Sequence, residues 1–163
     1  MAADPIALRR VVGDERTTVL LSSLRAIQLY ILREAAFAGP VLGTAQAVVD
    51  YIRADIGNAR VETVKLLLLD ARRHLLHELC VSIGSIDAAE LPLREILRHA
   101  LNADARGIIL VHNHPSGSPT PSRADIELTA RIAHALNGLH IILFDHLIVT
   151  EDGVSSFREL GLI

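Results

Sequence analysis

The run of residues 107–111, Gly-Ile-Ile-Leu-Val, is the feature that most constrains how this chain can fold. A strand without a polar side chain needs cover on both faces, because apolar surface left in water costs free energy. A sheet with helices on each side provides that cover. From residue 61 onward, strand-like segments alternate with helix-like segments. The pattern therefore predicts an α/β fold, in which a mixed β-sheet is flanked by helices.

Apolar periodicity and chain breakers divide the sequence into four helices and five strands. The helices are expected at residues 17–37, 44–56, 93–102 and 122–137. The strands are expected at residues 61–69, 74–83, 107–111, 139–144 and 147–150. Gly39-Pro40 separates the first helix from the rest, so we expect a short helical N-terminal arm over residues 1–38 and a domain over residues 40–163.

Composition limits the function classes. Half of the 163 residues are hydrophobic, which is enough for a sizeable core. The net charge is −3 and the pI is near 6.2, which argues against a strongly basic nucleic-acid binder. The sequence shows no apolar run long enough for a membrane span or a signal peptide, so a cytoplasmic protein is expected. Cys80 lies in an apolar stretch and is expected to be a small core residue.

The segment after the apolar strand carries the candidate chemistry. His112 and His114 are two residues apart, so both side chains point to one side if the strand conformation continues. Asp125 falls in the first turn of the next helix and can return a carboxylate to them. Two imidazole nitrogens and one carboxylate suit a catalytic zinc site, which leaves a fourth position open.

A second interpretation of the same residues needs no metal. Ser122 and Asp125 have the spacing of a capping box, with Asp in place of the usual Glu or Gln. A carboxylate in the first turn also interacts favourably with the helix dipole. On the residues alone, the metal site and the helix cap both remain open.

The spacing of His112, His114, Pro115, Ser122 and Asp125 resembles the JAMM metal-binding motif of MPN/JAB domains. The stretch His-Asn-His-Pro-Ser-Gly, followed by Pro-Ser-x-x-Asp, resembles the RadC family more narrowly. Asp145-His146 and the closing residues 155–162 also resemble that family. The resemblance implies that residues 40–163 form an MPN/JAB domain, a cytidine-deaminase-like sandwich. One departure is that Pro92-Leu93-Arg94-Glu95 lacks the histidine usual at that place.

The resemblance also implies a chemistry and a set of roles. Zn²⁺ would be held by His112, His114 and Asp125, and Ser122 would help to stabilise the oxyanion of a peptide or isopeptide substrate. A glutamate from an earlier strand would activate water. Glu78, on the strand expected at 74–83, is the preferred candidate for that base, with Glu90 and Glu95 as alternatives.

Three functions follow as hypotheses. The first is a zinc-dependent metallopeptidase or isopeptidase of the JAMM type. The second is a DNA-repair-associated protein, for which neither half of the chain shows the required basic excess. The third is a non-catalytic MPN scaffold, against which the intact ligand set argues.

Overall fold

A computed structural model describes residues 14–41, 45–83 and 93–163 of the chain. Its centre is a five-stranded sheet in the order β2-β1-β3-β4-β5. The strands are β1 (Thr63–Leu69), β2 (Leu75–Ile83), β3 (Gly107–Asn113), β4 (Ile142–Val149) and β5 (Val154–Ser156). β3 and β4 are parallel and the other neighbours are antiparallel. The predicted mixed sheet is therefore confirmed.

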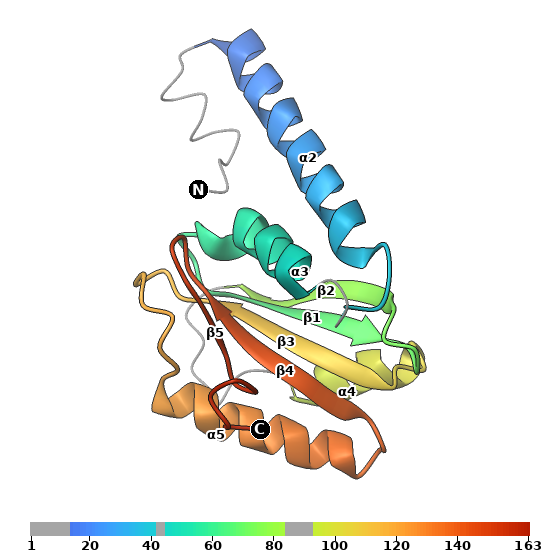
Figure 1. Ribbon diagram of the computed structural model, residues 1–163. Helices are drawn as coiled ribbons and strands as arrows, with labels where there is room; N and C mark the ends of the chain where they lie inside the picture. Colours follow the sequence, from blue (N-terminus) through green and yellow to red (C-terminus); the bar gives the residue numbers. More distant parts are fainter. Residues whose placement is uncertain (1–13, 42–44, 84–92) are drawn as a thin grey trace.

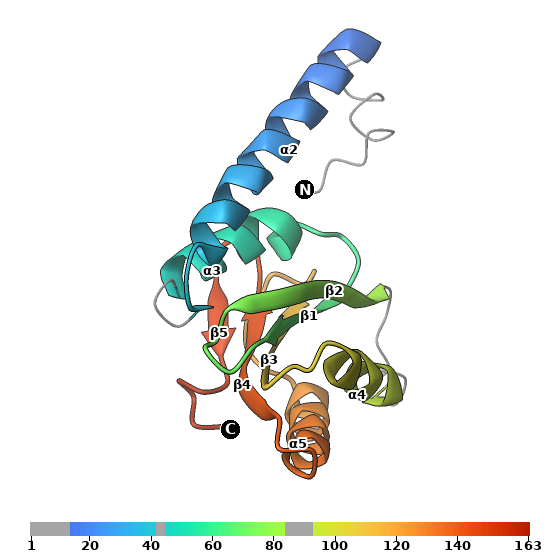
Figure 2. The same ribbon diagram turned by 90° about the vertical axis from the view of Figure 1, so that its right-hand side faces the viewer.

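Helices cover both faces of this sheet (Figures 1 and 2). The helices are α2 (Glu15–Phe37), α3 (Ala45–Ile52), α4 (Leu93–Asn102) and α5 (Arg123–Asn137). α3 continues as a single π-helical turn, η2 (Arg53–Gly57). α2 and α3 lie on one side of the sheet, and α4 and α5 lie on the other. None of the described helices combines the length and the apolarity needed to span a membrane.

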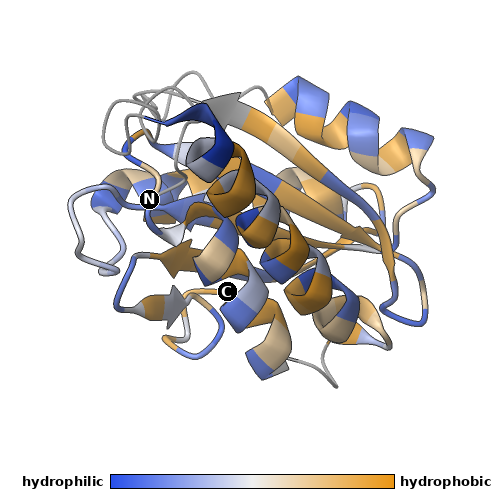
Figure 3. Ribbon diagram, turned by 90° about the horizontal axis from the view of Figure 1, so that it is seen from above, coloured by the Kyte–Doolittle hydropathy of each residue, from blue (hydrophilic) through white to orange (hydrophobic). Residues whose placement is uncertain are grey.

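Alternation along the two central strands builds two cores. On β3, Ile108 and Leu110 belong to the cluster with α4 and α5, whereas Ile109 and Val111 belong to the cluster with α2 and α3. All seven residues of β3 are buried. Figure 3 shows the hydrophobic strands beneath the helices. The apolar run that predicted a doubly covered strand is thus the centre of the fold.

Two element boundaries differ from the sequence prediction. β3 continues through His112 and Asn113, which were expected to begin a loop. The two strands expected at 139–144 and 147–150 are the single strand β4. A bulge explains the second difference: Ile108 pairs with Leu143 but Ile109 pairs with Asp145, so Phe144 is an extra residue. The bulge accommodates the extra residue, so β4 stays in the sheet through the polar residues Asp145 and His146.

The bulge also explains Gly107. A Cβ atom at Gly107 would lie 2.0 Å from a carbon of the Phe144 ring. We expect Gly107→Ala to lower the free energy of unfolding by about 1–3 kcal/mol, because the ring would be forced from its place. Denaturant unfolding measures this. Gly138→Ala is the control, since a Cβ there would lie 3.6 Å from the carbonyl oxygen of Ala135, an ordinary contact. Equal stability of the two variants would contradict the expectation.

The helix α2 lies in the segment that was expected to form an arm. Arg25 donates to the carbonyl oxygens of Ala54 and Asp55, at 2.9 and 3.3 Å, and Arg33 lies 3.4 Å from Glu78. Ala36 is buried at the end of the helix near the sheet. The helix is therefore tied to the domain at several points, while the division at residue 39 stays a prediction.

Cys80 corrects one expectation. It is exposed, not a core residue. β2 is an edge strand, and alternate residues point to opposite faces. Leu79 and Val81 pack against the core with α4 and α5, which places Cys80 on the other side.

Candidate metal centre

The end of β3 carries two imidazoles on one face of the sheet. His112 is only 4% exposed, and its ring meets that of His114 edge to face, with centroids 4.7 Å apart. β1 and β4 fix this strand end on both sides, since His112 pairs with Val64 and with Ile148. The sheet therefore places His112, and His114 follows directly after the strand end.

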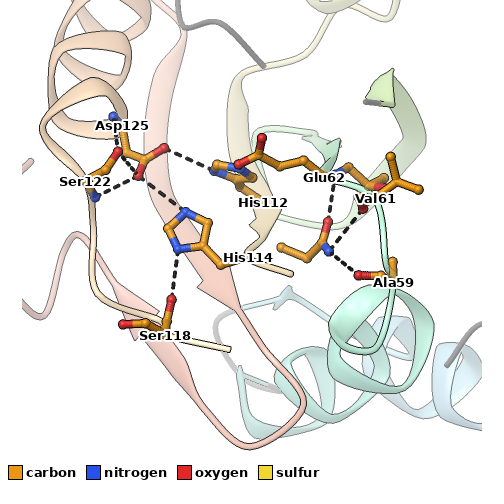
Figure 4. Close-up of polar contacts among 10 residues, drawn as sticks. Ala59, Val61, Glu62, His112, His114, Ser118, Ser122 and Asp125 are labelled. Atoms are coloured by element: carbon orange, nitrogen blue, oxygen red, sulfur yellow. Dashed lines mark hydrogen bonds and ion pairs between the residues drawn. The ribbon is translucent and has the colours of Figure 1, made fainter. Parts of the chain in front are cut away.

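α5 brings a carboxylate to the same point. Asp125 Oδ1 lies 3.2 Å from His112 Nδ1, and Asp125 Oδ2 lies 3.4 Å from His114 Nε2 (Figure 4). Ligand atoms of a tetrahedral zinc site with bonds of about 2.0–2.1 Å are roughly 3.3 Å apart. The structure thus brings the Asp125 carboxylate close to both imidazoles, and the role of these three residues as ligands stays a prediction.

A backbone contact prepares His114 as a ligand. Its Nδ1 lies 2.9 Å from the carbonyl oxygen of Ser118. A carbonyl can only accept, so Nδ1 carries the proton and Nε2 keeps its lone pair. Nε2 is the nitrogen that faces Asp125. This arrangement of a donated outer N–H is typical of metal-binding histidines.

The capping box is present as well. Ser122 Oγ accepts from the Asp125 N–H at 3.1 Å, and Asp125 Oδ2 accepts from the Ser122 N–H at 2.8 Å. The two interpretations of these residues are therefore compatible. Ser122 Oγ lies 2.5 Å from Asp125 Oδ2, so its single proton goes to that carboxylate. An oxyanion role for Ser122 stays a prediction, and it requires that proton to be redirected.

The acidity of this carboxylate reflects its neighbours. Burial alone would raise the pKa of Asp125, but hydrogen bonds from His112 and Ser122 outweigh burial and hold that pKa well below its usual range. Asp125 is therefore an anion at any pH at which the protein would work. An anionic carboxylate is the form that binds a metal ion.

Sequence reasoning missed Glu62. Its Oε1 lies 2.8 Å from His112 Nε2, on the side of the ring opposite Asp125. Burial would lower the pKa of His112, but hydrogen bonds to Asp125 and Glu62 raise it above its ordinary value. Glu62 precedes β1 directly, so only the pairing of β1 with β3 brings it here. No local pattern signals that pairing.

Two three-residue donor sets share the histidines. Ligand atoms of Glu62, His112 and His114 all lie within 4.8 Å of one another. The alternative set replaces Glu62 by Asp125. We favour Asp125 as the ligand, because its two carboxylate oxygens lie 3.2 and 3.4 Å from nitrogens of His112 and His114. Either set offers two imidazole nitrogens and one carboxylate, which are ligands that zinc accepts. The carboxylate that is not a ligand would then lie beside the ion.

The structure does not bring Glu78 to this centre, which corrects the preferred choice of base. Glu78 accepts from Tyr51 Oη at 2.9 Å and lies 2.7 Å from Lys65 Nζ. It pairs with Leu67, whose side chain belongs to the core with α2 and α3. His112 pairs with Val64 of the opposite core, so the two side chains lie on different faces of the sheet.

The other two glutamates give no substitute. Glu95 is paired with Arg98 on the exposed side of α4. Glu90 lies outside the residues that the structure describes. Glu62 is therefore the glutamate that the described structure places at the centre.

An open cleft leads to these residues. It has a volume of about 420 Å³. It is lined by Arg60, Val61, Glu62, His114, Pro115, Ser116 and Ser122. Members of the candidate centre, Glu62 and His114, thus form part of its wall, where a substrate could reach them.

His146 of β4 is a buried neighbour of the centre, in contact with His112, Phe157 and Thr129. Its ring is stacked on Phe157 and lies nearly parallel to that of His112, with centroids 4.4 and 6.1 Å away. Thr129 Oγ donates to the Asp125 carbonyl at 2.5 Å, so His146 Nδ1, 2.7 Å away, must donate to Thr129. Burial, with the nearby charge of His112, lowers the pKa of His146 to about 3. A neutral His146 therefore steadies the first turns of α5.

Comparison with known proteins identifies relatives. Residues 42–162 match the family described as "RadC-like JAB domain". A "UPF0758 protein" of Rhodobacter capsulatus is 37% identical over 164 aligned positions, which cover all of this chain and 77% of that protein. A UPF0758 protein of Neisseria meningitidis strain FAM18 is 39% identical over 140 positions, which cover 86% of this chain and 62% of that protein. The chain is thus shorter than these relatives.

Proposed function

Because this chain belongs to the RadC-like JAB domain family, we propose that it is a zinc-dependent hydrolase that cleaves peptide or isopeptide bonds. The observation that supports the proposal is the pair of carboxylates around two imidazoles. Asp125 faces both rings, and Glu62 faces His112 from the other side, at the wall of an open cleft. A second carboxylate that is not a ligand stands where it can act as a base toward water at the open position of a three-ligand site.

The proposed roles follow from this geometry. His112, His114 and Asp125 would hold the ion. When bound, zinc would supply Lewis acidity and make water a nucleophile near neutral pH. Glu62 takes the proton of the attacking water at a carboxylate oxygen and delivers it to the leaving nitrogen. Ser122 orients Asp125 through its two hydrogen bonds. The proposal includes a cytoplasmic location, which a single cysteine supports.

Metal analysis combined with a peptidase assay tests the proposal. We expect the purified chain to hold about one zinc ion, as a single site predicts. Fluorogenic peptides and isopeptide-linked substrates should be cleaved, and a chelator should stop the cleavage. A zinc-loaded chain that cleaves neither substrate class would favour the non-catalytic scaffold, and a chain that holds no zinc would reject the metal centre itself.

A further inference from the structure

We propose that Asn113 is a positioning residue, which fixes Glu62 relative to the two histidines of the metal centre. The inference rests on the proposed function, since it concerns the place of Glu62 in that site. Asn113 is the last residue of β3, between His112 and His114 in the chain, and strand alternation turns its side chain away from that of His112. Three consecutive residues at this strand end thus serve the same centre in two directions.

The amide group of Asn113 makes three hydrogen bonds, and all three partners lie in residues 59–63. It is fully buried. Its Oδ1 accepts from the Thr63 N–H at 2.7 Å. Its Nδ2 donates to the carbonyl oxygens of Ala59 and Val61, at 3.2 and 3.3 Å. These partners lie on both sides of Glu62 in the chain. Figure 4 shows Ala59, Val61 and Glu62 beside the histidines.

Glu62 lies just before the sheet. Among the described residues, the pairing of β1 with β3 begins at Val64 and His112. The segment before Glu62 follows the π-helical turn and has no regular structure. The Asn113 side chain joins the residues on both sides of Glu62 to the end of β3, next to the proposed ligands.

Asparagine is suited to this task by its hydrogen-bonding groups. The segment presents one N–H that needs an acceptor and two carbonyls that need donors, and an amide offers both. An ionised aspartate would accept from Thr63 but would donate to neither carbonyl. A buried alanine would leave all three backbone groups without this partner, which costs stability.

A double-mutant cycle separates positioning from general stability. Zinc dissociation constants would be measured by chelator competition for the full chain, Asn113→Ala, Glu62→Ala and the double variant. Glu62 contacts the proposed ligand His112, so if Asn113 acts through Glu62, Asn113→Ala should weaken zinc binding in the parent, by at most the roughly 10–100-fold that loss of a ligand's hydrogen-bond partner costs. In the Glu62→Ala background, Asn113→Ala should change the zinc dissociation constant by less than about twofold, which is the error of additivity. Asn102→Ala, at an exposed asparagine of α4, is the control.

Amide hydrogen exchange on the metal-free chain gives a second, independent measurement. Asn113→Ala should speed exchange at Thr63 by about tenfold more than at Leu66, because Thr63 loses its acceptor. Asn113→Asp keeps that acceptor, so Thr63 should stay protected in this variant. If Asn113→Ala does not fold, Asn113→Asp takes its place in the cycle.

The outcomes are distinct. Equal losses of zinc affinity with and without Glu62 would overturn the positioning role, and so would exchange at Thr63 that rises only in step with Leu66. A chain that binds no zinc would defeat the proposed function. The exchange experiment would then still decide whether Asn113 holds the Glu62 segment.

Discussion

Glu62→Gln is expected to lower the rate of amide hydrolysis by about 10²–10⁴-fold while zinc stays bound. Glutamine keeps the shape of the side chain but offers no site for a proton from water. The three proposed ligands are untouched, so the metal content should match that of the parent. Steady-state kinetics on a fluorogenic peptide, with metal analysis of the same sample, measures both quantities.

Glu78→Gln is the matched control for this prediction. Glu78 lies on the opposite face of the sheet, among Tyr51, Lys65 and Arg33, so its loss should leave the rate per folded molecule unchanged. The variant should instead melt at a lower temperature, because Lys65 loses an ion-pair partner at a largely buried site. The assignment of Glu62 fails if Glu78→Gln abolishes turnover and Glu62→Gln does not.

His114→Ala is expected to abolish stoichiometric zinc binding without unfolding the chain. Two extensive apolar cores stabilise the chain, so we expect the fold not to depend on the metal. His112→Ala should lose zinc as well. Asp125→Asn should bind zinc more weakly, because a neutral amide is a poorer ligand than a carboxylate. Metal analysis and circular dichroism give the two readings.

His134→Ala is the control for the metal prediction. His134 is exposed on α5, beyond the turns that carry Asp125. It should keep full zinc occupancy. Occupancy that is also full in His114→Ala would remove the metal assignment, and a random-coil spectrum after chelation of the parent would contradict the independence of the fold.

The elements that sequence analysis predicted correctly depend on local patterns. The apolar run at 107–111 required a doubly covered strand. Pro92 marked the start of α4, and the predicted range 93–102 is that of the helix. The proximity of His112, His114 and Asp125 was also predictable, because two histidines at a strand end and a carboxylate in the next helix are close in sequence; their role as ligands stays a prediction. Their meeting in the structure needs only a strand, a loop and a helix.

The side chains that sequence analysis misplaced or missed are those whose position depends on pairing between strands distant in the sequence. Glu78 was assigned to a strand correctly, but its face is set by the register of β2 on β1, which no local pattern shows. Glu62 reaches His112 across 50 residues of chain for the same reason. Cys80 was misplaced because an apolar stretch does not reveal that its strand is at the edge of the sheet.

A residue that closes a helix cap and also serves as the proposed metal ligand, as Asp125 does, is constrained in two ways over evolutionary time. Asp125 closes the capping box of α5, so selection for folding alone would oppose its loss even in a lineage that had abandoned catalysis. Glu62 caps no helix and belongs to no strand. Among descendants of a common ancestor, a retained Asp125 would therefore say little about activity. A retained glutamate at position 62 would be the more informative sign that the chemistry is still under selection.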